Sequence, residues 1–323
     1  MSRARRSALM IVGLLAVGAC TSEPRATAAT TPTSEAGPLL PVSLVDGTGT
    51  AVTITSVDRI VPVDGDLAEI VFALGLGDRV VATDISATYP AAADELPEIG
   101  YQRALNPEPI AAMEPTVVLA TDLARPAETL EQLRGLGIAV VVIERTMSID
   151  GFAAKVQAVA DALGVPQRGA ALVSTMQAQV ADARAAALQA GGSPRVLALY
   201  LRGEQVQLIF GQGTGIDAVL PAVGAVDVST ELGIVDTQQM TAEAMLLAAP
   251  DVLLVTTSGL ESVGGIDGLL AIPGIARTPA GRERRVLAYE DQYLLGGGPR
   301  IGDLMLELVR DLHPSTPNTE GTP

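Results

Sequence analysis

The chain has 323 residues, enough for two lobes of ordinary domain size, and 48% of them are hydrophobic, so buried cores are expected. Aromatic residues make up only 2%, which means that the cores must be built from Ala, Val, Leu and Ile and that each aromatic residue is informative. The net charge of −16 and the lack of a basic stripe argue against nucleic acid as a partner.

The N-terminus predicts export and a lipid anchor on the outer face of the cell membrane. Basic MSRARRS precedes the apolar run ALMIVGLLAV, which is too short for a membrane span and typical of a signal peptide. The small residues before Cys20 resemble a bacterial lipobox, so we expect residues 1–19 to be removed and Cys20 to be lipidated. The alternative is an ordinary secretory signal with an incidental cysteine. Residues 20–38 predict a disordered tether, and residues 314–323 a disordered tail.

Between these segments, short apolar runs alternate with helical patterns, which predicts α/β layers with parallel strands. In a first lobe at 39–148, the expected strands are 59–63, 79–82, 116–120 and 139–143, and the expected helices are 66–74, 106–113 and 127–136. Two further helices, 151–163 and 167–189, fall within a predicted helical linker at 149–191. The second is long enough to act as a strut between two lobes.

The second lobe, residues 192–313, repeats the plan of the first. EPIAAMEPTVVLAT (108–121) aligns without gaps on EAMLLAAPDVLLVT (243–256), and LAEIVFALGLGD (67–78) aligns on IDAVLPAVGAVD (216–227). Either pair alone is open to chance, because both segments are rich in Ala, Val and Leu. Two pairs in the same order indicate two related α/β lobes, with a ligand expected in the cleft between them.

Several segments between residues 59 and 305 carry a family resemblance. They are RIVPVDGDLAEIVFALGLGDRVVATD (59–84), YP (89–90), LPEIGYQRALNPEPIAAMEPTVVLAT (96–121), QLRGLGIAVVVIE (132–144) and LLGGGPRIGDLM (294–305). The chain resembles the helical-backbone substrate-binding lipoproteins of ABC importers for cobalamin, siderophores or haem. IGY, LNPE and GGGPR are most similar to the haem-binding branch. The resemblance implies two Rossmann-like lobes joined by a helical backbone, and a monomer that captures ferric haem b and delivers it to a permease and its ATPase.

Ferric haem needs an axial ligand to its iron, and the residue types available here are Tyr and Met. The sole histidine, His313, lies next to the tail, and Cys20 is assigned to the anchor. In LALYLRG (197–203), Tyr200 and Arg202 share one face of a strand, because side chains alternate along it. Iron stabilises phenolate, and Arg202 would donate to that oxygen. The alternative is a lobe edge in which Arg202 pairs with Glu204.

Tyr101, in EIGYQRAL, is the second candidate ligand to the iron. The resemblance implies that this loop supplies a Tyr ligand in many relatives and a His in some, and that the latter also have Tyr-x-Arg in the second lobe. This chain has Tyr at both places, so one tyrosine or both would bind iron. The alternative for Tyr101 is a loop aromatic residue that packs against Pro97.

Further haem contacts are expected from cleft-lining and basic residues. Tyr89 either lines the cleft or forms a structural turn, and Met147 is a weak ligand or a packing residue. Arginines at predicted strand ends or in loops are candidates to meet the propionates: Arg103, Arg125, Arg145 and Arg300. Arg300 has the alternative role of bracing the GGGP turn.

Glu69 and Glu243, on one helix of each lobe, match positions that in the resembled family form salt bridges to permease arginines. Two anionic side chains, one in each lobe, would orient the docked protein. The alternative is a pair of solvated helix faces.

Other classes of protein fit less well. A ferric-siderophore or cobalamin binder of an ABC importer is the alternative within the family. A hydrolase is disfavoured because GxSxG is missing and the lone histidine is near the tail, so we expect no enzyme. A structural or adhesive lipoprotein would not require paired tyrosines. GQGTGID (211–217) is Gly-rich but lacks the Lys of a P-loop, and predicts a tight strand-to-helix turn near the ligand.

Overall fold

The computed structural model describes residues 37–314. The predicted signal peptide, Cys20, nearly all of the predicted tether and residues 315–323 of the predicted tail lie outside the described residues. Within residues 37–314, no helix has both the length and the apolar character needed to cross a membrane.

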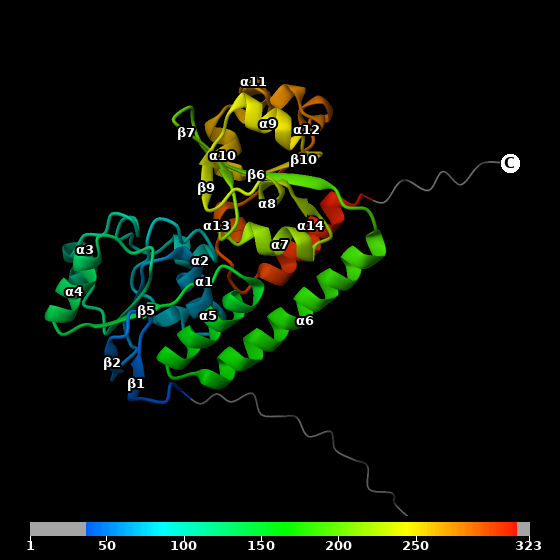
Figure 1. The fold of residues 1–323 in the computed structure, drawn as a ribbon. Helices are drawn as coiled ribbons and strands as arrows, with labels where there is room; N and C mark the ends of the chain where they lie inside the picture. Colours follow the sequence, from blue (N-terminus) through cyan, green and yellow to red (C-terminus); the bar gives the residue numbers. More distant parts are fainter. Residues whose placement is uncertain (1–36, 315–323) are drawn as a thin grey trace, which may run out of the picture. The chain divides into compact units, whose positions relative to one another are not determined.

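The first lobe is built around a parallel sheet of three strands in the order β3-β4-β5 (Figure 1). Its strands are β1 (Val42–Val45), β2 (Ala51–Ile54), β3 (Ile60–Pro62), β4 (Val117–Thr121) and β5 (Ala139–Ile143), of which β1 and β2 form a separate antiparallel hairpin. Its helices are α1 (Gly65–Ala73), the short 3₁₀ helix η1 (Gly77–Arg79), α2 (Ala91–Asp94), α3 (Pro107–Ala112) and α4 (Ala127–Gly135). The β4 strand is buried along its whole length, as expected for a strand covered on both faces.

The strand predicted at 79–82 is wrong. Val80 forms one isolated bridge to Ile60, and Thr83 forms another to Glu98. Because the extended segment divides its pairing between two partners, no continuous ladder forms. The other strands predicted in this lobe, and its predicted helices, are confirmed to within three residues at each end.

Two helices, α5 (Ile149–Ala162) and α6 (Pro166–Ala190), connect the lobes. Ser148 caps α5 by accepting a hydrogen bond from the Gly151 N–H at 3.0 Å, and Pro166 occupies the first turn of α6, where no N–H partner is needed. With 25 residues, α6 is about 37 Å long at 1.5 Å per residue. The predicted helical connector is therefore confirmed.

The second lobe contains the sheet order β11-β10-β6-β7-β9, with β8 paired to β6. Its strands are β6 (Arg195–Arg202), β7 (Val206–Phe210), β8 (Val226–Asp227), β9 (Thr237–Gln239), β10 (Val252–Thr256) and β11 (Val286–Tyr289). Its helices are α7 (Ile216–Ala222), α8 (Val228–Glu231), α9 (Ala242–Ala248), α10 (Thr257–Ser262), α11 (Gly265–Ala271), η2 (Ile275–Arg277), α12 (Pro279–Glu283), α13 (Asp291–Leu295) and α14 (Ile301–Leu312).

The predicted internal repeat has a structural counterpart. The aligned segments 108–121 and 243–256 each fold as a helix followed by a buried parallel strand, α3 then β4 and α9 then β10. The segments that begin at 67 and 216 supply α1 and α7. The parallel run β3-β4-β5 corresponds to β6-β10-β11, to which the second lobe adds the antiparallel strands β7 and β9. The predicted fold class, two related α/β lobes with a helical connector, is confirmed.

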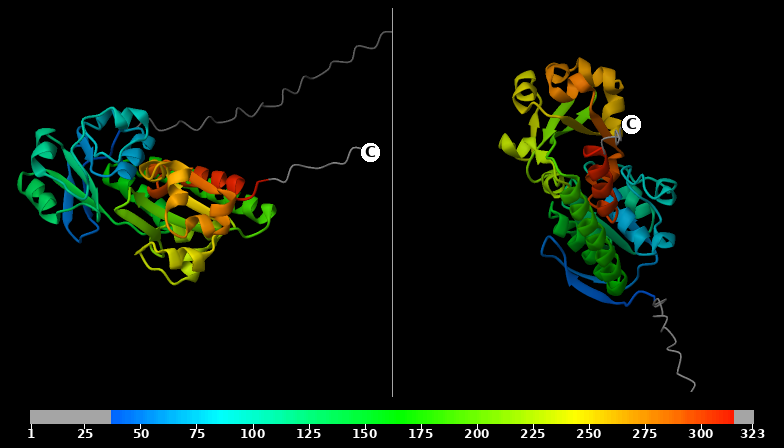
Figure 2. Two further views of the ribbon diagram at one scale, coloured as in Figure 1. Left: turned by 90° about the horizontal axis from the view of Figure 1, so that it is seen from above. Right: turned by 90° about the vertical axis from the view of Figure 1, so that its right-hand side faces the viewer.

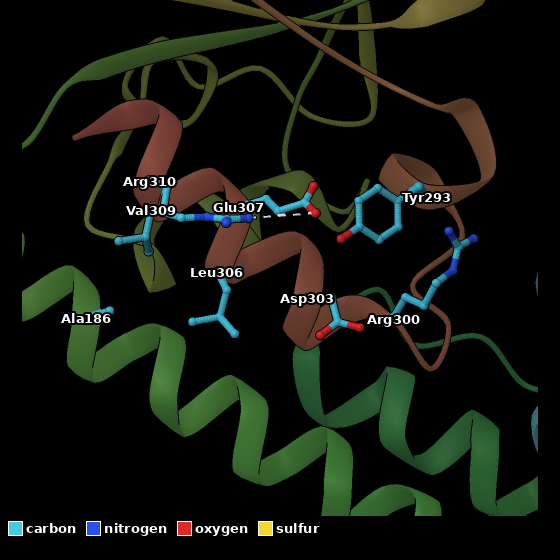
Figure 3. Close-up of a pocket in the computed structure, with 8 residues that line it drawn as sticks. All are labelled: Ala186, Tyr293, Arg300, Asp303, Leu306, Glu307, Val309 and Arg310. Atoms are coloured by element: carbon cyan, nitrogen blue, oxygen red, sulfur yellow. Dashed lines mark ion pairs between the residues drawn. The ribbon is translucent and has the colours of Figure 1, made fainter. Parts of the chain in front are cut away.

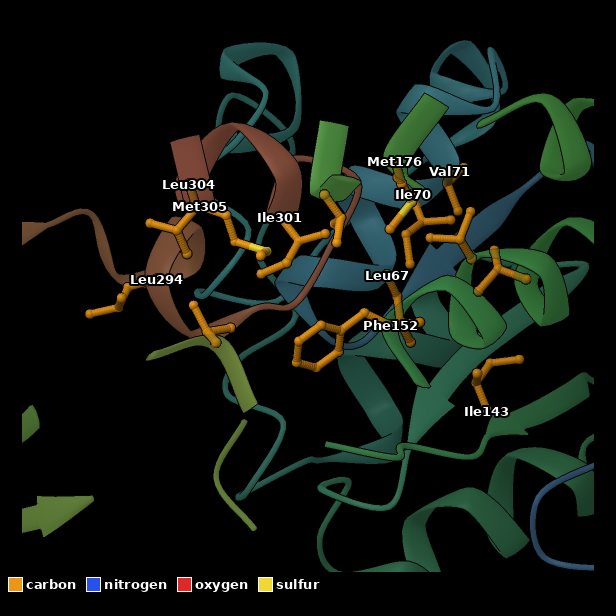
Figure 4. Close-up of a cluster of buried hydrophobic side chains, with 14 of the residues drawn as sticks. Leu67, Ile70, Val71, Ile143, Phe152, Met176, Leu294, Ile301, Leu304 and Met305 are labelled. Carbon is orange, nitrogen blue, oxygen red and sulfur yellow. The ribbon is translucent and has the colours of Figure 1, made fainter. Parts of the chain in front are cut away.

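One hydrophobic core extends from the first lobe into the C-terminal helix. Leu67 and Ile70 of α1 belong to the same buried cluster as Phe152 of α5, Met176 of α6 and Met305 of α14 (Figure 4). The helices α5 and α14 both pack against α6, and the right-hand view of Figure 2 shows α14 in red beside green α6. This shared core holds the C-terminal segment, which carries the candidate site residue Arg300, against the first lobe.

Candidate functional site

Strand β6 presents Tyr200 and Arg202 on one face. Both side chains are partly exposed while Leu199 and Leu201 are buried, as the alternation of a half-buried strand requires. The Arg202 guanidinium carbon lies 4.5 Å from the centroid of the Tyr200 ring, and Phe210 of the neighbouring strand meets that ring edge-on with centroids 5.6 Å apart. The predicted juxtaposition of Tyr200 and Arg202 is confirmed.

Arg202 forms its ion pair with Asp291, not with Glu204. Its Nη2 lies 2.6 Å from the Asp291 Oδ1, and its Nη1 donates to the Leu201 carbonyl at 2.7 Å. Ser258 donates its hydroxyl hydrogen to the same carboxylate, with 2.7 Å to each oxygen. Three segments of the second lobe therefore meet at this ion pair: β6, α10 and the start of α13.

Tyr101 lies in a loop of the first lobe and is held in a different way. Its side chain is 37% exposed, and among residues 37–314 no hydrogen bond or ring contact engages the phenol. The backbone next to it is ordered, because the Ala104 N–H donates to the Tyr101 carbonyl at 2.8 Å and Gln102 is buried. The contacts within the described residues do not join Tyr101 to Tyr200, so the structure does not itself assemble the two predicted ligands.

Three carboxyl groups are buried between this loop and the start of α1. Burial, followed by repulsion from Asp66, raises the pKa of Asp64 well above its ordinary value, and Asp84 adds to the rise. Burial also raises the pKa of Asp84 to about 6, although the hydrogen bonds that its Oδ1 accepts from Ser86 oppose the rise. The Ile85 N–H, next to Asp84, donates to the Gly100 carbonyl at 3.0 Å, so the segment that carries Asp84 is bonded to the backbone next to Tyr101.

Arg300, predicted to contact propionates, is held between the first lobe and the C-terminal segment. Its Nε and Nη2 donate to the two Glu69 carboxylate oxygens at 2.9 and 2.8 Å. The guanidinium carbon lies 3.7 Å from the Tyr89 ring centroid and 4.7 Å from that of Tyr293. Burial would lower the pKa of Arg300, but the hydrogen bonds and charge of Glu69 raise it. Arg300 thus forms a bidentate ion pair with Glu69 and lies between the Tyr89 and Tyr293 rings. These contacts favour its alternative role, which is to brace the GGGP turn.

The expectation that Glu69 presents a free anionic side chain at the surface is wrong. Its side chain is 5% exposed, and both oxygens accept from Arg300. Gln292 completes the enclosure by donating to Glu69 at 3.1 Å and to the Gly65 carbonyl at 2.8 Å. Its amide oxygen accepts from the Tyr89 N–H at 2.9 Å. Sequence reasoning missed Gln292, because its partners lie more than 200 residues away.

The glycines before Arg300 allow this close approach. Gly297 has φ +55°, and a Cβ at this position would lie 2.4 Å from the Phe152 ring. Lys155, the only lysine of the chain, bonds to Asp66 and donates to the Gly296 carbonyl at 2.8 Å. The glycines of GGGPR are therefore bound to the connecting helix α5 by close packing on Phe152 and by the hydrogen bond from Lys155.

The remaining predicted haem contacts are three arginines, which differ in whether they form an ion pair, and Met147. Arg145 is ion-paired with Asp122 at 2.6 Å. Arg103 and Arg125 are exposed, and neither takes part in an ion pair within residues 37–314. Met147 is half-buried and packs against the main core, in agreement with a packing role.

In the GQGTGID segment, Asp217 accepts hydrogen bonds from the Gly213 and Gly215 N–H groups, both at 3.0 Å. These amides are therefore engaged by a side chain of their own loop. The segment is the predicted tight turn into α7.

A cavity of about 630 Å³ lies between α6, α13 and α14 (Figure 3). It is lined by Ala186, Tyr293, Arg300, Asp303, Leu306, Glu307, Val309 and Arg310. Burial, followed by the charges of Glu307 and Asp303, raises the pKa of Tyr293. Neither Tyr101 nor Tyr200 borders this cavity, so it is distinct from the predicted iron ligands.

Glu243 is exposed in the first turn of α9, as expected. Its counterpart in the internal repeat is Glu108, which is exposed in the first turn of α3. The signal was present in the sequence, because 108–121 aligns with 243–256 and begins with this glutamate. The pair of equivalent exposed carboxylates is thus Glu108 and Glu243.

Comparison with known proteins finds relatives over most of the chain. RhuT, a periplasmic haem-binding protein from Roseiflexus sp. RS-1 solved in apo form, is 46% identical, with a TM-score of 0.78 over 79% of this chain and 98% of that chain. The haem-binding protein HmuT is 34% identical, with a TM-score of 0.82 over 88% of this chain and 94% of its own. HmuT has also been solved with single alanine substitutions of a histidine, a tyrosine and an arginine.

Among curated proteins, an uncharacterised ABC transporter substrate-binding lipoprotein of Bacillus subtilis, YvrC, is 25% identical over 86% of this chain and 87% of its own length. The family model for periplasmic binding proteins matches residues 60–293, which cover most of both lobes and the helical connector. The chain belongs to the periplasmic binding protein family.

Proposed function

We propose that this protein captures ferric haem b between its two lobes through tyrosine ligation and delivers it to the permease of an ABC importer. The observation that carries the proposal is the stack of Arg202 on Tyr200 in β6. In HmuT the substituted tyrosine and arginine lie two residues apart, as Tyr200 and Arg202 do. The substituted histidine precedes that tyrosine by the same number of residues that separates Tyr101 from Tyr200.

The chemistry of the two positions supports this proposal. Phenolate oxygen is a hard anionic ligand that suits ferric iron, and the metal charge stabilises the phenolate form. A guanidinium beside Tyr200 would offset the negative charge of the ligand and donate a hydrogen bond to its oxygen. Tyr101, whose phenol is exposed, is the candidate for the opposite face of the haem.

Export and membrane anchoring form part of the proposal. The charged and apolar segments before Cys20 predict a lipidated N-terminus, and YvrC is named a lipoprotein. For the permease we propose Glu108 and Glu243 as the contact residues, because they are exposed at equivalent places in the two lobes. Leu247, one turn after Glu243 and 72% exposed, would add apolar contact area.

The experiment is a titration of the purified protein with hemin, followed by visible absorption. We expect one saturable complex with a phenolate-to-iron charge-transfer band, which Tyr200→Phe shifts and weakens and which Tyr200→Phe with Tyr101→Phe abolishes. Cobalamin and a ferric siderophore serve as competing ligands. No saturable hemin complex, or displacement of hemin by equimolar cobalamin, would contradict the proposal.

A further inference from the structure

We propose that Asp291 is a positioning residue that holds Arg202 against Tyr200 and thereby strengthens the binding of ferric haem. This inference rests on the proposed function, because it assigns a role to a residue beside the Tyr200 ligand. Asp291 lies outside the segments that suggested the ligands, and its carboxylate touches the guanidinium and not the phenol.

The contacts of Arg202 show why it needs an anchor. An arginine side chain has many rotamers, and an unanchored guanidinium would spend little time over one ring. Its Nη1 bonds only to uncharged groups, the adjacent Leu201 carbonyl at 2.7 Å and the Thr256 hydroxyl of β10 at 3.4 Å. The Asp291 carboxylate, 2.6 Å from Nη2, is the charged partner that selects the rotamer over Tyr200.

Asp291 is itself held on a rigid element. Ser258 donates its hydroxyl hydrogen to the carboxylate, and the Ser258 N–H lies 3.3 Å from Oδ2. The adjacent residue Gln292 is buried and bonds to Gly65 and Glu69 of the first lobe. The start of α13 is therefore fixed on both sides, which is the arrangement that pre-organises a ligand's supporting residue.

The assignment explains the charges at this site. With Tyr200 bound to ferric iron as phenolate, the Arg202 guanidinium would lie between two anions, that oxygen and the Asp291 carboxylate. The ion pair is only partly buried, with side chains 38% and 27% exposed, so its contribution to folding is small and its geometric role dominates.

The test is a double-mutant cycle on hemin affinity and on the charge-transfer band. Asp291→Ala should weaken hemin binding by about tenfold and shift the band in the same direction as Arg202→Ala, since lost support of a metal ligand costs roughly 10- to 100-fold. In the Arg202→Ala background, Asp291→Ala should have no further effect. Asp291→Asn, which keeps one acceptor oxygen, should restore part of the affinity.

The matched control is Asp267→Ala, which removes an exposed aspartate ion-paired with Arg284 at 2.7 Å in the same lobe and should change neither readout. If Asp291→Ala fails to fold, Ser258→Ala decides, and a band shift in the direction of Arg202→Ala supports the proposal. An unchanged band and affinity in Asp291→Ala, or effects that add to those of Arg202→Ala, would overturn it. Failure of the proposed function looks different, because the wild-type protein would then lack a charge-transfer band that responds to Tyr200→Phe.

Discussion

The two lobes repeat one α/β plan but hold their candidate ligands differently. In the second lobe, Tyr200 projects from a central strand, with Phe210 at its edge and Arg202 over its face. In the first lobe, Tyr101 sits on a loop with an unengaged, 37% exposed phenol. One tyrosine is pre-organised and the other is free to adapt, so most of the binding energy of a haem should come from the second lobe.

The largest effect on stability is expected for substitution of Glu69 in the first lobe, in contrast to Glu243 in the second lobe. Glu69→Ala leaves the Arg300 guanidinium without its bidentate acceptor, and breaking such an enclosed pair should lower the free energy of unfolding by about 3–5 kcal/mol. Glu243→Ala, on the exposed start of α9, should change it by less than about 1 kcal/mol. Urea unfolding of both variants measures the difference. Equal losses would contradict the assignment of Glu69 to the interior.

The loop that carries Tyr101 should respond to pH through Asp84. Its pKa of about 6 in the folded state exceeds the ordinary 3.8, so the folded protein holds this proton more tightly than the unfolded chain does. The resulting stabilisation is fully present below pH 3.8 and is lost as the pH rises through 6. For Asp84→Asn, the change in the free energy of unfolding between pH 4 and pH 7 should differ from that of wild type by up to about 3 kcal/mol. Identical pH profiles of wild type and variant in urea titrations would exclude this role.

Substitution of each tyrosine tests directly whether Tyr200 contributes more to hemin affinity than Tyr101 does. Loss of a supporting residue costs a metal site roughly 10- to 100-fold in affinity, so loss of the ligand itself in Tyr200→Phe should cost about 100-fold, or about 2.7 kcal/mol. Tyr101→Phe should cost about tenfold, because no contact within residues 37–314 pre-organises its phenol. Hemin titrations of the two variants and the double variant measure these losses. A larger loss in Tyr101→Phe would invert the roles of the lobes.

Much of this arrangement was predictable, since local pattern determines it. Alternation along β6 placed Tyr200 and Arg202 together, and apolar runs located the three strands of the first-lobe parallel sheet, β3, β4 and β5. Partners remote in sequence could not be predicted: Asp291 is 89 residues from Arg202, and Arg300 is 231 from Glu69. The position of Glu69 on an amphipathic helix suggested solvent, but tertiary packing supplied a buried cation and enclosed the carboxylate. Glu108 could have been found from the repeat alone.

The smallest effect on the purified protein is expected at the proposed permease contacts. Glu108 and Glu243 are exposed first-turn residues of α3 and α9, so Glu108→Arg with Glu243→Arg should lose only the interaction with each helix dipole, about 1 kcal/mol or less per site. Hemin affinity should stay unchanged, because within residues 37–314 no hydrogen bond, ion pair or ring contact joins either glutamate to Tyr101 or Tyr200. Uptake of haem by cells should fall, since reversed charges repel cationic permease residues. Arg substitution of the exposed Asp267 is the control. Normal haem uptake by the double variant would show that Glu108 and Glu243 are not permease contacts.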